Sequence, residues 1–187
     1  MKVLNIHESA LPASREEIGA LIASLASPAD ALWPRQCWPR MQFERPLGVG
    51  ARGGHGPIRY LVEAYVPGQS VKFRFTGPKG FDGYHGYEIA ETLDALVLRH
   101  TLQMTTRWFA VLSWPLLFRP LHDALIEDSL ATARASLGQP PNSRPWSPWV
   151  RFLRWVVSGG KAGSQVMPNP SLHRTRSGGL RPPTRAG

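Results

Sequence analysis

Hydrophobic side chains recur along the chain with two different periods, and each period predicts a type of element. Residues 12–26 carry Ser14 and Glu17 in the spacing of a helical capping box, followed by apolar residues three and four apart, which predicts a helix. From residue 57 the period becomes two. Residues 58–64 and 70–77 alternate apolar and polar side chains, which predicts half-buried antiparallel strands.

The same pattern continues through a predicted hairpin and ends in a long helix. Residues 84–90 and 95–104 alternate again, and the four residues between them, 91–94, have the length of a hairpin connection. Residues 2–9 form a further short predicted strand. Residues 119–137 show helical spacing, and Gly138 follows in the place of a left-handed helix end.

The charge of the chain is concentrated in its last quarter. The formal net charge is +9, yet residues 1–138 contain 14 Lys and Arg against all 13 Asp and Glu. Residues 139–187 contain 8 Lys and Arg and no acidic residue. Because binding to phosphates requires a concentrated basic face, this near-neutral body is not expected to bind nucleic acid.

The composition after Gly138 predicts a change in organisation. Residues 139–187 are rich in Gly and Pro, which predicts a mostly disordered basic tail following a domain at residues 1–138. Within this tail, residues 146–157 space tryptophans and aliphatic side chains as in a short amphipathic helix. Such a helix could rest on the domain or, as the less favoured reading, contact a membrane surface through Trp146–Val157.

Cysteine content and hydropathy bear on the cellular compartment. The single cysteine, Cys37, excludes an internal disulfide, and the first ten residues contain no apolar run of signal-peptide length. The most apolar stretch, residues 108–118, is too short to span a bilayer and contains a proline. We therefore expect a cytoplasmic protein.

The order of predicted elements resembles that of the START-like or SRPBCC superfamily, which includes polyketide cyclases/dehydrases and lipid-transfer-like proteins. The resemblance spans about residues 1–138 and includes uncharacterised bacterial members. It is carried by four stretches: LPASREEIGALIASL, YLVEAYVPGQSVKFRFTGPKGFDGYHGYEIA, LVLRHTLQM and LFRPLHDALIEDSLATA. It implies an α+β helix-grip fold, in which a curved antiparallel sheet wraps around a long C-terminal helix. An apolar cavity between them would hold a hydrophobic or amphipathic small molecule.

The apolar alternation supplies candidate ligand-binding residues for such a cavity. Those on the predicted inner faces are Ile58, Tyr60, Val62, Phe73, Phe75, Leu98, Leu102, Leu121 and Leu125. Polar candidates on the same faces are His85, Tyr87, His100 and Asp128. Burial of a ligand against these side chains would drive binding, and the polar groups would orient the ligand.

A predicted strand register brings two of the polar candidates together. If Ala90 pairs with Ala95 across the hairpin, His85 lies directly opposite His100 on the cavity side. Asp128 falls on the apolar arc of the long helix, where a carboxylate needs a partner, so we expect it beside these histidines. This cluster could ligate a metal, orient a ligand or only satisfy its own polar atoms.

The other polar residues of the long helix are expected to be ordinary. Asp123 and Glu127 share a polar stripe, and His122 lies at the margin of another, so all three are predicted to face water or the cavity rim. Residues 48–53 match the GxGxxG pattern, but Pro57 and a period-two segment follow them instead of a helix. A dinucleotide site is therefore rejected, and a sheet corner or cavity rim is predicted.

Two functions remain open for the domain, and a third hypothesis is a peripheral membrane or partner-docking module that acts through Trp146–Val157. The first is binding of a hydrophobic or amphipathic small molecule by a carrier or sensor, without catalysis, cofactor or metal. The alternative is a cyclase- or dehydratase-type enzyme in which His85 or His100 serves as general acid/base, because the pKa of histidine lies near neutrality.

Overall fold

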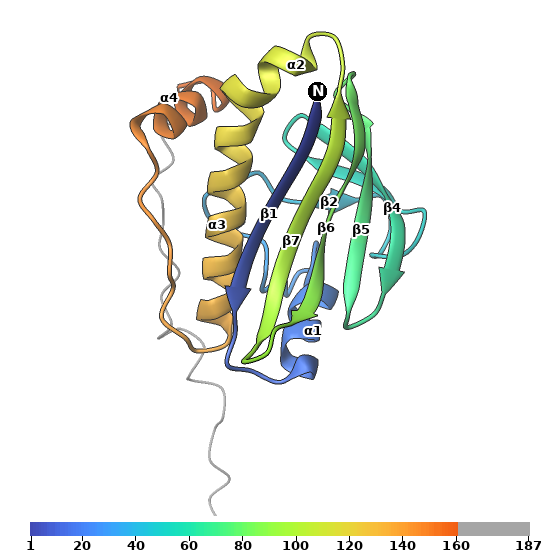
Figure 1. Cartoon of the computed structure of the whole chain (residues 1–187), viewed down its shortest axis with the longest axis vertical. Coiled ribbons are helices and arrows are strands. Elements are labelled where there is room, and N and C mark those ends of the chain that lie inside the picture. The colour runs from blue at the N-terminus through green and yellow to red at the C-terminus, as the bar shows by residue number, and fades with distance from the viewer. Residues whose placement is uncertain (161–187) are drawn as a thin grey trace, which may run out of the picture.

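The computed structural model describes residues 1–160 of the chain (Figure 1). Its elements, in chain order, are β1 (Lys2–Ala10), α1 (Arg15–Ser24), β2 (Gln42–Phe43), β3 (Arg52–His55), β4 (Ile58–Val66), β5 (Ser70–Gly77), β6 (Phe81–Glu91), β7 (Leu96–Thr106), α2 (Ala110–Ser113), the π-helical turn η1 (Trp114–Phe118), α3 (Arg119–Ser136) and α4 (Pro148–Val157). Within these residues, no helix is long and apolar enough to cross a membrane.

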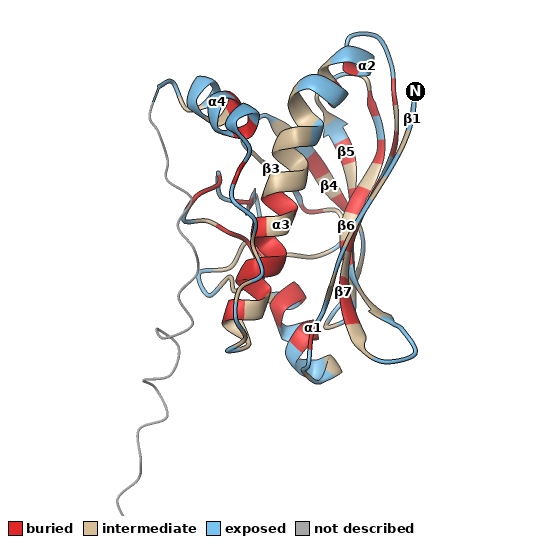
Figure 2. Ribbon diagram, turned by 60° about the vertical axis from the view of Figure 1, so that its left-hand side comes forward, coloured by how far each residue is buried: buried red, intermediate tan, exposed pale blue. Residues whose placement is uncertain are grey.

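One curved antiparallel sheet is gripped around the long helix α3. Within residues 1–160 the sheet has seven strands in the order β1-β7-β6-β5-β4-β3-β2. Helix α3 runs along the inner side of the sheet, and α1 lies at the end where β6 turns into β7 (Figures 1 and 2). The predicted α+β helix-grip fold is therefore confirmed.

The start of α1 follows from its capping residues. The Ser14 hydroxyl accepts a hydrogen bond from the Glu17 backbone N–H at 3.2 Å, and the Glu17 carboxylate accepts one from the Ser14 N–H at 2.8 Å. This reciprocal pair satisfies two amides that a helix end leaves free. One turn later, Gly19 packs directly against the backbone of Gly68 in the turn between β4 and β5. The predicted capping box is confirmed.

The hairpin between β6 and β7 corrects the predicted register by two residues. Glu91 pairs with Leu96, so His85 lies opposite Leu102, and His100 lies opposite Tyr87. The Thr92 N–H and hydroxyl donate to the Ala95 carbonyl, and the Thr92 hydroxyl accepts from the Ala95 N–H. Strand β6 therefore continues to Glu91, one residue beyond the predicted pair at Ala90. Because a shift of two residues keeps each side chain on its face, the inner faces are still those predicted.

The long helix begins after two short helical segments that lead into it. Helix α2 passes into η1, where Pro115 stands at the start of the wider turn, and α3 continues from Arg119. At the other end Gly138 has a φ of +72°, so the predicted left-handed helix end is confirmed.

The packed part of the chain extends beyond the predicted boundary at Gly138. Trp146 and Val150 are buried in the same hydrophobic cluster as the domain core, and α4 occupies residues 148–157. The predicted boundary at Gly138 is therefore too early, because a buried tryptophan and one face of α4 pack against the domain. The remainder of the predicted tail, residues 161–187, lies outside the described residues.

The core fills one end of the sheet more completely than the other. A large cluster joins α1, the loop around Trp33 and the lower half of α3 to the sheet. A smaller cluster, which includes Phe81, Met104 and Trp114, closes the opposite end beneath α2 and η1. This division leaves space beside the upper half of α3.

Candidate functional site

A cavity of about 610 Å³ lies between the sheet, the start of α3 and α4. Its walls are mainly apolar and come from distant parts of the sequence. They include Trp33, Trp38, Ile58, Phe75, Phe81, Leu102, Trp114, Leu117, Phe118, Leu121, Leu125, Ile126 and Val157. A cavity of this size and lining is typical of small-molecule sites.

The structure divides the predicted ligand-binding residues into two groups. Ile58, Phe75, His85, Leu102, Leu121 and Leu125 line the cavity. The second group is buried in the closed core or behind the wall instead: Tyr60, Val62, Phe73, Tyr87, Leu98 and His100. The expectation that all of them face the cavity is corrected, because α1 and the loop around Trp33 fill that end of the sheet.

Imidazole rings are the main polar groups in the apolar wall. Among the described lining residues these are His55, His85 and His122. The Nε2 atoms of His85 and His122 are buried and have no hydrogen-bond partner within residues 1–160. Buried polar atoms are normally paired, so each free Nε2 is a group for which a ligand atom would supply the missing partner.

The Nδ1 atoms of His55 and His85 have neighbours, and a further buried polar pair lies behind the wall. His85 Nδ1 lies 3.4 Å from Nε2 of His100, His55 Nδ1 lies 3.1 Å from the Tyr60 hydroxyl, and the Tyr87 hydroxyl lies 2.8 Å from that of Ser129. The two predicted partners, His85 and His100, are thus neighbours despite the shifted register. His85 lines the cavity, whereas His100 lies behind it and packs against the His85 ring.

Burial keeps these imidazoles neutral. It lowers the pKa of His55 to about 3 and holds the pKa values of His85 and His100 well below the ordinary value. Burial also lowers the pKa of His122, although Asp123 opposes this effect. At neutral pH each ring therefore carries one proton and offers one lone pair.

Asp128 does not join the histidines. Its carboxylate accepts hydrogen bonds of 2.8 Å from the indole N–H groups of Trp38 and Trp146, and the Cys37 thiol lies 3.9 Å away. The predicted cluster of His85, His100 and Asp128 is therefore wrong. Helical spacing placed Asp128 correctly on a buried face, but the chain segments that cover this face are the Trp38 loop and the segment around Trp146 that precedes α4.

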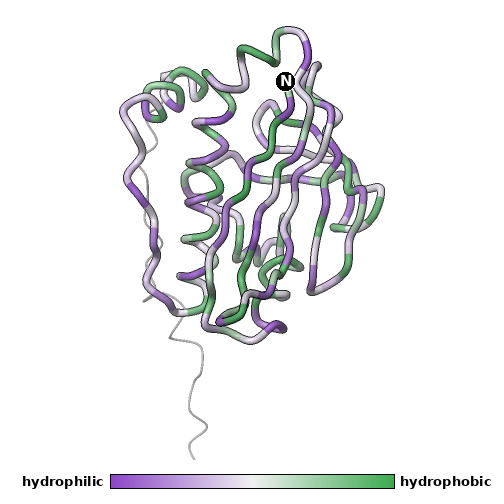
Figure 3. Tube along the Cα trace, viewed as in Figure 1, coloured by the Kyte–Doolittle hydropathy of each residue, from purple (hydrophilic) through white to green (hydrophobic). Residues whose placement is uncertain are grey.

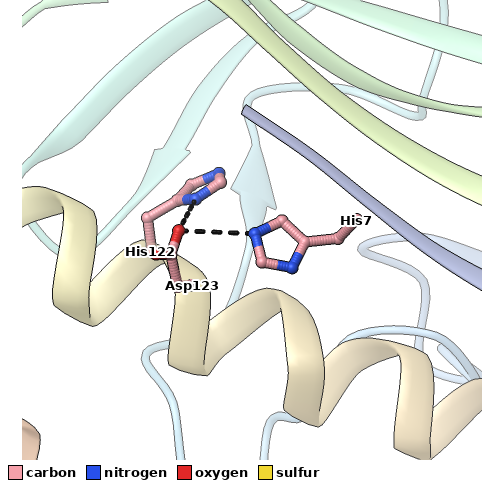
Figure 4. A group of neighbouring side chains, drawn as sticks. All are labelled: His7, His122 and Asp123. Atoms are coloured by element: carbon pink, nitrogen blue, oxygen red, sulfur yellow. Dashed lines mark hydrogen bonds and ion pairs between the residues drawn. The ribbon is translucent and has the colours of Figure 1, made fainter. Parts of the chain in front are cut away.

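A charged cluster between β1 and α3 was missed at the sequence level. His7 Nδ1 lies 2.7 Å from a Glu127 oxygen, and its Nε2 lies 3.3 Å from Oδ1 of Asp123. The same Asp123 oxygen lies 3.4 Å from Nδ1 of His122 and accepts a hydrogen bond from Asn5 at 3.0 Å. Figure 4 shows Asp123 between the two imidazoles. The expectation that His122, Asp123 and Glu127 form an ordinary solvated margin is thus corrected.

A sequence signal for this cluster exists on both elements. Asn5 and His7 are polar residues two apart on one face of β1, and Asp123 and Glu127 are acids four apart on one face of α3. Polar pairs with the spacing of a strand face and of a helix face are complementary if the two elements pack together. Periodicity alone does not say that β1 and α3 do so.

The cluster holds a proton on His7. Burial alone would lower the pKa of His7, but the hydrogen bonds and charges of Asp123 and Glu127 outweigh it and raise the pKa to about 9. Burial would raise the pKa of Asp123, but His122 and His7 hold it below its ordinary value. His7 is therefore an imidazolium between two carboxylates at neutral pH.

Three residues of this cluster are the group among residues 1–160 that could surround a metal ion. Ligand atoms of His7, His122 and Asp123 lie within 4.8 Å of one another. A metal would need the lone pair of His7, which the proton occupies while the pKa of this residue stays near 9. The arrangement thus favours a proton at neutral pH.

Arg154 adds a positive charge to the cavity wall. Its guanidinium stacks over Trp38 at 4.4 Å from the ring centre and donates a hydrogen bond to the Cys37 carbonyl, while its buried Nε has no partner among residues 1–160. Burial lowers its pKa, which the charges around Cys37 and Asp128 oppose. Arg154 follows the predicted boundary at Gly138 and was therefore not among the predicted site residues.

Comparison with solved structures identifies the fold. No family model and no curated protein matches the sequence. The di-domain ARO/CYC StfQ from the steffimycin biosynthetic pathway matches with a TM-score of 0.52 at 13% identity, over 72% of this chain and 50% of that one. This chain thus spans half the length of StfQ.

Two further structures agree along most of both chains. A protein from Thermobifida fusca matches with a TM-score of 0.53 at 12% identity, covering 76% of this chain and 99% of that one. CalU16 from Micromonospora echinospora matches with a TM-score of 0.50 at 13% identity, covering 87% and 85%. At such low identity these likenesses show the fold alone, which is the helix-grip fold that the sequence resemblance predicted.

Proposed function

We propose that this protein binds a hydrophobic or amphipathic small molecule as a carrier or sensor. The observation that carries the proposal is an apolar cavity of about 610 Å³ whose buried polar atoms include the partnerless Nε2 groups of His85 and His122. Burial of apolar surface would drive binding at about 25 cal/mol per Å², before the cost of ordering the ligand. The free ring nitrogens would fix its orientation.

The wall chemistry narrows the ligand class. An apolar body would contact Phe75, Leu102 and Leu121. A neutral imidazole can donate or accept one hydrogen bond at Nε2, whereas the Nε–H of Arg154 can only donate. A ligand whose polar end offers an oxygen acceptor to Arg154 and a hydroxyl donor to a histidine Nε2 therefore fits this wall better than a pure hydrocarbon.

A matched pair of variants tests the proposal. Leu117 lines the cavity, whereas its neighbour Leu116 points outward and is exposed. Titration of the purified full chain with 8-anilinonaphthalene-1-sulfonate should show saturable binding, and Leu117→Trp should weaken the affinity at least about tenfold by filling the cavity. Leu116→Trp should leave the affinity within about twofold.

Equal affinities for the two variants would contradict binding in this cavity. Native mass spectrometry of the full chain supplies a second measurement, because a retained organic molecule released on unfolding would identify the natural ligand class. A cavity variant of the expected fold that retains the same molecule would also contradict the proposal.

The second candidate function is an enzyme of the cyclase or dehydratase type. The observation that favours it is the pairing of His122 Nδ1 with Asp123 at 3.4 Å in a ring that lines the cavity and whose buried Nε2 has no partner within residues 1–160. A carboxylate that holds one ring nitrogen fixes the tautomer and leaves a lone pair at the other nitrogen for a general base. In this reading His122 takes the role that sequence analysis gave to His85 or His100.

Turnover distinguishes this candidate from a carrier. With a β-keto thioester as substrate, His122→Gln should lower the rate about 10² to 10⁴-fold while the affinity for 8-anilinonaphthalene-1-sulfonate changes less than about threefold. A wild-type protein that binds the thioester and returns it unchanged would remove the enzyme reading and leave the carrier reading intact.

A further inference from the structure

Large apolar side chains are exposed on two neighbouring elements beside the cavity. They are Trp108, Phe109 and Leu112 around α2, and Trp149, Phe152 and Trp155 on α4; we call these six residues the docking face. Trp108 is 77% exposed and Phe109 80% exposed. Apolar patches of this kind mark interaction sites, because scattered single residues are normal but contiguous aromatic groups are not.

Helix α4 is apolar around more than half of its circumference. Val150 and Leu153 are buried against the domain, and Trp149, Phe152 and Trp155 continue the apolar arc as an exposed row. These three rings stack along the helix, with centroids 5.4 Å and then 6.4 Å apart. Val150 and Leu153 are sufficient to pack α4 on the domain, so the exposed aromatic row needs a separate explanation.

The two parts of the docking face belong to one end of the molecule. The Trp149 indole N–H donates a 3.0 Å hydrogen bond to the Leu116 carbonyl of η1, which ties α4 to the segment after α2. Figures 1 and 2 both place α4 and α2 at the same end, next to the start of α3. Hydrophobic colouring follows both helices in Figure 3.

Basic side chains lie around the docking face. Arg107, Arg119 and Arg151 are exposed beside it. Arg107 and Arg119 form ion pairs with Asp82 and Asp123 at 3.5 and 3.6 Å, whereas Arg151 on α4 is followed by no Asp or Glu, since the sequence has none at residues 107–122 or after residue 128. A second copy of this chain on the same face would bring these arginines against each other. An anionic lipid surface would instead attract them while the aromatic rings enter the interface.

We propose that the docking face binds the surface of a bilayer containing anionic phospholipid. The cavity is next to this surface, because Val157 at the end of α4 is 53% exposed and also lines the cavity. Binding would place the cavity opening at the membrane, where an amphipathic ligand could be exchanged. Trp146, which sequence analysis included in a membrane segment, takes no part because its indole is buried on Asp128.

Vesicle sedimentation of the full chain tests this proposal. The probes are large unilamellar vesicles of phosphatidylcholine and phosphatidylglycerol at 7:3, and of phosphatidylcholine alone. We expect binding to the mixed vesicles, weakened by salt, and a loss of at least about tenfold in the partition coefficient for the double variant Phe152→Gln/Trp155→Gln. Leu93→Gln, which removes a fully exposed leucine at the far end of the sheet, should bind as wild type.

Circular dichroism and thermal melting check that each variant folds. Arg151→Glu, which changes an exposed charge without touching the aromatic row, should also weaken binding to the mixed vesicles several-fold.

Equal binding of the double variant and wild type would overturn the proposal, since it would assign any membrane affinity to other basic residues. A dimer in sedimentation velocity that the double variant abolishes, with no vesicle binding, would overturn it in favour of a second copy. Affinity for 8-anilinonaphthalene-1-sulfonate should not change in the double variant, so the outcome is independent of the proposed cavity function.

Discussion

The indole of Trp146 donates a 2.8 Å hydrogen bond to the carboxylate of Asp128, which joins the segment after Gly138 to the middle of α3. The same carboxylate accepts the indole N–H of Trp38 at 2.8 Å, and the two indoles meet edge to face at 5.5 Å. A single buried acid thus holds together the loop before β2, the long helix and the approach to α4. The cavity wall at Trp38 and Arg154 depends on this junction.

The first prediction concerns this acid. Asp128→Ala should lower the free energy of unfolding by about 2 to 4 kcal/mol, because it leaves two buried indole N–H groups without their acceptor. Chemical denaturation followed by tryptophan fluorescence measures the loss. Asp94→Ala, at an exposed position in the turn after β6, should change stability by less than about 0.5 kcal/mol. Similar stabilities for the two variants would show that Asp128 does not hold the junction.

The second prediction is a loss of stability at alkaline pH through His7. The pKa of His7 is raised to about 9 in the folded protein, above its unfolded value near 6.5, so the charged form stabilises the fold. This contribution should be complete below pH 6.5 and disappear as the pH rises through about 9. Melting temperatures of wild type and His7→Gln should therefore differ most below pH 6.5 and converge above pH 9. A difference that is constant from pH 6 to 10 would exclude an imidazolium at this position.

The third prediction concerns acid and the buried histidine His100. Burial holds its pKa well below 6.5, so below that pH the unfolded chain takes up a proton that the folded protein refuses. Stability should fall by about 1.4 kcal/mol per pH unit below 6.5 for each such histidine. His100→Leu should reduce this slope between pH 6.5 and 5, measured from urea unfolding. An unchanged slope would mean that His100 is already protonated in the folded state.

The fourth prediction tests the contact between α1 and the turn after β4. A Cβ at Gly19 would overlap the carbonyl oxygen of Gly68, which is backbone and has little room to move. Gly19→Ala should therefore destabilise the protein by about 1 to 3 kcal/mol, although alanine is the better helix former. In Gly48→Ala the nearest added contact is 3.8 Å away, so this control should be nearly neutral. A stabilised Gly19→Ala variant would contradict the close approach.

The sequence was sufficient for the elements and their faces. Capping at Ser14 and Glu17, alternation along β5 to β7, and a left-handed Gly138 are local properties, because each depends on residues within a few positions. The inner faces of β6 and β7 were predicted correctly even though the register was two residues off. A strand repeats its side-chain directions every two residues, so periodicity cannot distinguish these two registers.

The site depended on tertiary packing. Helical spacing showed that Asp128 is buried, but only the fold brings Trp38 and Trp146 to it instead of His85. His122 looked marginal by its angle on the helix, yet it lines the cavity because η1 and the sheet enclose the start of α3. A hydrophobic pattern tells which side of an element avoids water, and it carries no information about which distant segment covers that side. That choice follows from the path of the chain, so the cavity, the His7 cluster and the exposed row on α4 became visible only in the folded structure.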